Sequence, residues 1–78
     1  MTLELDLHGL TSEEAVYTIQ RTIVNNPLCD YIEVIHGFNN GSVLKDLLSN
    51  KANIHSKRVI ATYPNPYNKG RTIIVLKK

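Results

Sequence analysis

Two histidine–glycine pairs hold the side chains best suited to chemistry, and each pair follows a short apolar stretch. The pairs are His8-Gly9 and His36-Gly37, and Asp6 stands two residues before the first. Imidazole gains and loses a proton near neutral pH, which suits the proton transfers of phosphodiester cleavage. Residues two apart on a strand share a side, where a carboxylate can orient an imidazole. We therefore take Asp6, His8 and His36 as candidate catalytic residues.

Cleavage of this kind divides the work between two groups. One imidazole would deprotonate a ribose 2′-hydroxyl or a water, and the other would stabilise the phosphorane or protonate the leaving oxygen. A metal site built from Asp6, His8 and His36 is the alternative reading. The set lacks a compact metal-binding motif, so we predict no metal ligand and no cofactor, with Mg²⁺ as the ion that remains open.

Glycines beside both histidines favour close approach of a phosphate to the backbone. Helices are expected to begin near Thr11 and Ser42, and the free N–H groups of a helix start attract anions. The candidate phosphate-binding residues of these two turns are Gly9, Gly37, Asn39, Asn40 and Gly41.

A second candidate contact lies near the C-terminus, in the segment Lys69-Gly70-Arg71. It offers two cations and a flexible glycine, and Tyr67 beside it is an aromatic able to stack on a base. The alternative is that Tyr63 and Tyr67 pack locally around the neighbouring prolines. We take Lys69, Gly70 and Arg71 as candidate nucleic-acid-binding residues.

The elements that must position these residues follow from periodicity and from helix signals. Alternating or continuous apolar runs predict four strands, and apolar residues at helical spacing predict two helices. Thr11 and Glu14 form a capping box at the first helix start, and Pro27 follows its end. The expected strands cover 2–7, 31–35, 57–62 and 72–76, and the expected helices cover 12–26 and about 43–50.

The order β-α-β-α-β-β predicts an α/β two-layer sandwich, with a mixed four-stranded sheet and both helices on one face. The β-α-β units are expected to be parallel pairs. The last strand is apolar throughout and should lie centrally in the sheet. The first two strands should be neighbours, about 4.8 Å apart, so that both imidazoles reach one small group.

Composition sets limits on the remaining function classes. The 78 residues suit one domain, 1–78, and the single cysteine, Cys29, excludes an internal disulfide and fits a cytoplasmic location. No apolar run is long enough for a membrane helix. Residues 1–39 carry six acidic and one basic side chain, whereas residues 40–78 carry one acidic and eight basic ones. The basic half suits a polyanion, unless the two halves neutralise each other. His55 lacks any such context and is expected to be a surface or loop residue.

The chain resembles the Smr domain, the small MutS-related module. The resemblance spans residues 3–76 and rests on Leu5-Asp6-Leu7-His8-Gly9 with Thr11-x-x-Glu14, on His36-Gly37 with Gly41, and on Gly70-x-Thr72. It implies a fold similar to the C-terminal domain of translation initiation factor three. It also implies nucleic-acid binding and, as in several members, endonuclease activity on DNA or on messenger RNA at stalled ribosomes. The sequence departs from the family's second glycine motif at Phe38 and Asn39.

Together these features predict a monomeric, nucleic-acid-binding Smr domain with nicking endonuclease activity on DNA or RNA, with the ribosome as a further partner and no membrane contact. A non-catalytic module that binds RNA, DNA or a ribosomal surface is the second hypothesis. A protein-interaction domain that uses an open sheet face is the third.

Overall fold

The computed structural model describes residues 1–37 and 43–77. Its elements follow the predicted order, with one addition, a short 3-10 helix in the segment expected to be a plain connection. They are β1 (Thr2–Asp6), α1 (Ser12–Asn25), β2 (Tyr31–Ile35), α2 (Val43–Leu48), the 3-10 helix η1 (Lys51–Ile54), β3 (Val59–Pro64) and β4 (Arg71–Leu76).

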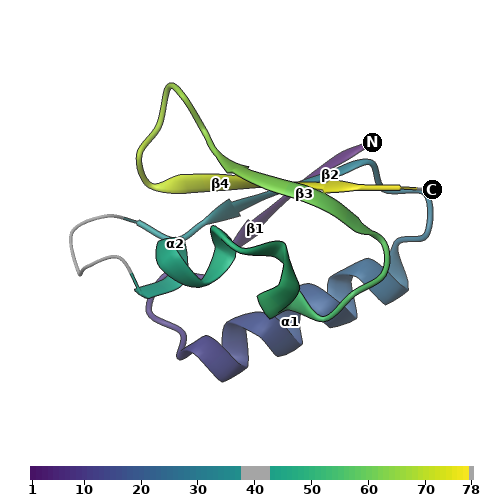
Figure 1. The fold of residues 1–78 in the computed structure, drawn as a ribbon, viewed down its shortest axis with the longest axis horizontal. Helices are drawn as coiled ribbons and strands as arrows, with labels where there is room; N and C mark the ends of the chain where they lie inside the picture. Colours follow the sequence, from purple (N-terminus) through teal and green to yellow (C-terminus); the bar gives the residue numbers. More distant parts are fainter. Residues whose placement is uncertain (38–42, 78) are drawn as a thin grey trace.

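The four strands form one mixed sheet in the order β1-β2-β4-β3. β1 and β2 are parallel neighbours, and β4 pairs antiparallel with β2 on one side and β3 on the other. The central place of β4 is confirmed, as is the position of both helices on one face of the sheet (Figure 1). The expectation of two parallel pairs is wrong for the second unit, because β4 lies between β2 and β3.

Helix α1 begins where its capping box predicts. The Glu14 N–H donates to Thr11 Oγ1 at 3.2 Å, and the Thr11 N–H donates to Glu14 Oε1 at 2.9 Å. This exchange satisfies two N–H groups that no helical carbonyl can reach. Ala15, Ile19 and Ile23 follow at four-residue spacing and are buried, so one stripe of α1 faces the sheet.

Arg58 completes the other end of α1. No basic residue lies in the last turn of the helix, but the Arg58 guanidinium donates to the carbonyls of Ile23 (2.8 Å) and Asn26 (3.2 Å). It also donates to those of Pro27 and Cys29, both at 3.0 Å. A cation here complements the negative end of the helix dipole. Arg58 therefore stabilises the fold, although it is one of the basic residues of the segment 40–78 that suggested polyanion binding.

The core lies between the sheet and the helices. Cys29 is fully buried within it, as expected of a small apolar side chain. The buried apolar residues are Leu7, Ala15, Ile19, Ile23, Cys29, Ile32, Val34, Leu44, Leu48, Ile54, Val59, Ile74 and Leu76. The face of the sheet away from the helices carries no helix of the described chain and is called the open face below (Figure 1).

Candidate nucleic-acid site

Three chain segments meet at one edge of the sheet. The pairing of β1 with β2 continues past β1, since the Leu7 N–H donates to the Ile35 carbonyl at 2.8 Å. Arg71, the first residue of β4, lies opposite Ile35. The turn after β1, the turn after β2 and the β3–β4 hairpin therefore share this edge (Figure 1), which is called the site edge below.

Asp6 and His8 form a hydrogen-bonded pair at the site edge. Nδ1 of His8 lies 2.5 Å from Asp6 Oδ1, and the His8 N–H donates to the same oxygen at 3.1 Å. Leu7 between them is buried, whereas the two polar side chains are 52% and 72% exposed. The chain then turns at Gly9, whose φ of +81° strains any residue with a Cβ. The turn leaves the imidazole accessible and held by the carboxylate.

The pairing shifts both titrations in opposite directions. The hydrogen bond and the charge of Asp6 raise the pKa of His8 above the usual value. The hydrogen bonds from the His8 side chain and backbone lower the pKa of Asp6. Each partner stabilises the charged form of the other, so the pair favours an imidazolium beside a carboxylate.

His36 has a different environment. It is buried, its Nδ1 lies 2.7 Å from the Gly37 carbonyl oxygen, and its Nε2 lies 2.8 Å from Thr72 Oγ1. A carbonyl only accepts, so Nδ1 carries the proton, and in the neutral ring Nε2 accepts from the Thr72 hydroxyl. Both ring nitrogens are thus used within the fold, so His36 positions its turn.

The two histidines lie on opposite faces of the sheet. Asp6 pairs with Ile35, so His8 is two residues past this pair and His36 is one residue past it. Side chains alternate between faces, which puts His8 with Asp6 on the open face and His36 with Thr72 on the helix-covered face. The expectation that both imidazoles reach one small group is therefore wrong, although both lie at the same edge.

Arg71 is paired with two carboxylates of the open face. Its Nη1 donates to Glu4 Oε2 at 2.8 Å and to Glu33 Oε1 at 3.2 Å. The hydrogen bond from Glu4 and the two nearby negative charges raise the pKa of Arg71. Asn65 also donates to Glu33, at 2.6 Å. Two acidic residues thus hold the cation that was expected to contact nucleic acid.

Gly70 joins the hairpin to the turn after β2. Its carbonyl accepts from the N–H groups of His36 (2.9 Å) and Gly37 (3.0 Å). A Cβ at Gly70 would lie 3.3 Å from the Gly37 Cα, a tight contact that a larger residue could make only if the Gly37 backbone shifted slightly. Gly70 is buried, whereas neighbouring Lys69 is exposed and keeps its charge at the surface.

The family model of the Smr domain matches residues 5–77, nearly the whole chain. The chain belongs to the Smr domain family. Its structure is similar to the crystal structure of the Smr domain of Thermus thermophilus MutS2, with a TM-score of 0.80 and 23% sequence identity. The match covers 97% of this chain and 99% of that one and supports the fold. No curated protein sequence matches the chain.

Part of the second glycine motif of this Smr domain, His36-Gly37 with Gly41, lies outside the described residues. The predicted phosphate-binding residues Asn39, Asn40 and Gly41, and the departure at Phe38, all fall there. Gly37 is described and has a φ of +74°, so the motif begins with a turn that favours glycine. Phosphate binding by this segment stays a prediction.

The sequence did not predict the residues that bond His36 and Arg71 at the site edge. Thr72 was noted only as a motif residue, and Glu4 and Glu33 only as charges. Glu4 alternates with Asp6, the pattern of residues on one face of a strand, and this pattern is the signal that would have placed it. Among the described residues, no group of three or more His, Cys, Asp or Glu side chains is arranged to hold a metal ion.

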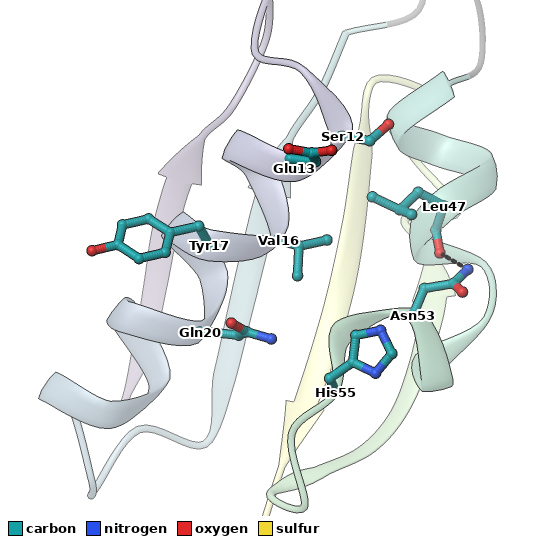
Figure 2. Close-up of a pocket in the computed structure, with 8 residues that line it drawn as sticks. All are labelled: Ser12, Glu13, Val16, Tyr17, Gln20, Leu47, Asn53 and His55. Carbon is teal, nitrogen blue, oxygen red and sulfur yellow. Dashed lines mark hydrogen bonds between the residues drawn. The ribbon is translucent and has the colours of Figure 1, made fainter.

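A surface groove of this Smr domain lies in the helix layer. Figure 2 shows a shallow groove with Val16 and Gln20 of α1 on one side and Asn53 and His55 on the other. The Asn53 amide donates to the Leu47 carbonyl at 2.9 Å. His55 is exposed at the end of η1, as expected of a surface residue. No helix of the described chain is long and apolar enough to cross a membrane.

Proposed function

We propose that this Smr domain binds nucleic acid and cleaves single phosphodiester bonds as a nicking endonuclease. The observation that carries the proposal is the exposed Asp6–His8 pair, in which a carboxylate holds one ring nitrogen of an accessible histidine. Such a pair orients the imidazole and makes it a stronger base.

The pair supplies a proton-transfer group in a defined tautomer. With Nδ1 bonded to Asp6, Nε2 is the nitrogen left to exchange a proton with substrate, and no described residue bonds it. Nε2 would take the proton of an attacking water or ribose 2′-hydroxyl, and Asp6 would stabilise the resulting imidazolium. The same nitrogen, when protonated, would stabilise the phosphorane.

The other candidate residues would position and hold the strand. His36, through Gly37 and Thr72, keeps the turn after β2 in place. Lys69 would neutralise a phosphate beside the pair. Arg71 orders the open face through Glu4 and Glu33. Any Mg²⁺ would be bound mainly by the substrate phosphates, and the proposed roles of these residues do not depend on it.

Cleavage of supercoiled plasmid and of structured RNA tests the catalytic role. The wild-type chain is expected to nick at least one of them, and a variant carrying Asp6→Ala and His8→Ala is expected to lose the activity. His55→Ala is the matched control, since it removes another exposed histidine away from the site edge. Equal cleavage by wild type and double variant would refute the assignment.

A non-catalytic binding module is the second candidate. The observation in its favour is that both nitrogens of His36 are bonded within the fold, which leaves one accessible imidazole among the described residues of the site edge. This candidate predicts salt-dependent binding of RNA or DNA without turnover. Contact with a ribosomal surface, a monomeric state and a cytoplasmic location are further parts of our proposal. Sedimentation with ribosomes and analytical ultracentrifugation test the first two.

A further inference from the structure

Tyr67 is an aromatic side chain with no role in the fold. It is 97% exposed, the largest exposed fraction among the large apolar residues that the structure describes. Local packing around the prolines, the alternative reading of the sequence, is therefore wrong for this tyrosine. A fully exposed aromatic gains almost nothing from burial, so stability gives no reason for it.

The backbone that carries Tyr67 is held in place. Asn65 Oδ1 accepts from the Tyr67 N–H at 2.8 Å, and Asn68 Oδ1 accepts from the Gly70 N–H at 3.0 Å. The Asn65 amide is itself bonded to Glu33 of the sheet. The hairpin is thus ordered before any ligand arrives, and binding there loses little conformational entropy.

The same hairpin reaches the site edge. The Gly70 carbonyl accepts from the N–H groups of His36 and Gly37, so the hairpin is joined to the start of the turn after β2. Exposed Lys69 stands two residues after Tyr67 and adds a cation. An aromatic face beside a free cation matches a base and its phosphate, the pairing that single-strand-binding surfaces use.

We infer that Tyr67 and Lys69 form a stacking subsite for an unpaired base and its phosphate, on the hairpin that is bonded to the turn after β2. The inference rests on the proposed nucleic-acid binding and adds a substrate requirement. In a continuous duplex each base is covered on both faces by its neighbours, so an external tyrosine finds no free face. The subsite therefore selects strands with an unpaired base.

The chain contains no tryptophan, so Tyr67→Trp introduces a single reporter at the subsite. Stacking on a base quenches indole fluorescence. We expect quenching of this variant by single-stranded oligonucleotides and no quenching by a covalently closed circular duplex, which has no exposed terminal base. Tyr17→Trp is the control, because Tyr17 is exposed on α1 in the helix layer, and its emission should not respond.

Affinity gives an independent readout. Tyr67→Ala is expected to weaken binding of a fluorescein-labelled single strand roughly 5- to 100-fold, the range for loss of one stacked base. Tyr67→Phe keeps the ring and should bind as wild type does. Parallel RNA and DNA strands distinguish the two sources of an unpaired base, and tyrosine stacking predicts a similar loss for both.

The outcomes separate this inference from the proposed function. Unchanged affinity of Tyr67→Ala, or an unquenched tryptophan in a variant that still binds the strand, would overturn the subsite and leave nucleic-acid binding intact. Absence of binding by the wild-type chain to any strand or duplex would overturn both. Circular dichroism of Tyr67→Ala should match wild type, since the side chain is almost fully exposed.

Discussion

The Nε2 atom of His36 lies 2.8 Å from Oγ1 of Thr72, and this contact joins the end of β2 to the neighbouring strand β4 inside the fold. Its other ring nitrogen meets the Gly37 carbonyl oxygen. His36, which the sequence suggested as a second catalytic group, thus has both ring nitrogens bonded within the fold. In our proposal, His8 therefore carries the chemistry and His36 positions the turn after β2.

Replacement of His36 should cost stability. His36→Ala leaves the buried Thr72 hydroxyl without its partner and is expected to lower the free energy of unfolding by about 1–3 kcal/mol. Urea denaturation measures the change. His55→Ala, an exposed histidine, should stay within about 0.5 kcal/mol of wild type. A His36→Ala variant with wild-type stability but no cleavage would restore the catalytic role and refute the positioning one.

The pKa of His8 should report the Asp6 carboxylate. Asp6→Asn removes the negative charge that raises this pKa, so the His8 titration followed by NMR should move to lower pH. If cleavage depends on His8, the limb of the pH–rate profile that it governs should move to lower pH as well. A titration unchanged by Asp6→Asn would contradict the pairing.

The same shifts set the sign of a stability effect. The raised pKa of His8 stabilises the fold below the usual histidine pKa, and this contribution is lost as the pH rises through the raised value. The lowered pKa of Asp6 stabilises the fold above the usual aspartate pKa, and this contribution is lost as the pH falls through the lowered value. The contribution of the pair should therefore be greatest between the usual aspartate and histidine pKa values. Asp6→Asn should lower stability in this pH range and reduce the slope of the pH–stability curve on either side of it.

Lys69 and Arg71 should differ in nucleic-acid binding. Lys69→Ala is expected to reduce the salt slope of binding by about one unit, the effect of one lost phosphate contact. Arg71→Ala should leave the slope nearly unchanged and lower stability, because Glu4 and Glu33 lose their shared cation. Fluorescence anisotropy across a salt series measures the slope.

A matched lysine control is available at the opposite edge of the sheet. Lys57 precedes β3, whereas the hairpin with Lys69 follows it. Lys57→Ala should leave the salt slope at the wild-type value. If Lys57→Ala and Lys69→Ala lower the slope equally, binding follows overall charge and the hairpin holds no local phosphate contact.

Arg58 should matter to stability alone. Arg58→Ala removes the guanidinium from four carbonyls at and beyond the end of α1, and we expect a loss of about 2–3 kcal/mol in the free energy of unfolding. Arg58→Lys should recover only part of the loss, because an ammonium cannot reproduce the planar fork. Thermal and urea denaturation measure both variants. Full recovery by lysine would show that charge alone stabilises this helix end.

The products of cleavage should identify the nucleophile. Attack by a ribose 2′-hydroxyl yields a 2′,3′-cyclic phosphate and a 5′-hydroxyl, whereas attack by water yields a phosphate monoester. RNA cleavage by His8 through the 2′-hydroxyl should continue in EDTA. A 5′-phosphate product that disappears with EDTA would instead indicate water attack assisted by Mg²⁺. End labelling and mass spectrometry distinguish these ends.

The local parts of the structure were determined by sequence alone. Thr11 and Glu14 define the start of α1 because their spacing closes a capping box. The apolar run of β4 predicted a central strand, and β4 lies between β2 and β3, although its residues alternate between buried and half-buried. The sequence also indicated that Asp6 and His8 share a side, and the turn after β1 brings the His8 ring to the Asp6 carboxylate.

Tertiary structure alone decided which groups face one another across segments. The register of β1 against β2 puts Asp6 opposite Ile35, and this offset of one residue sends His36 to the helix-covered face. Arg58 and Arg71 both look like surface cations in the sequence. In the structure, backbone carbonyls of a distant segment bind Arg58, and carboxylates of distant strands bind Arg71. Periodicity reports which side of an element a residue occupies, and only the pairing of elements reports what it meets there.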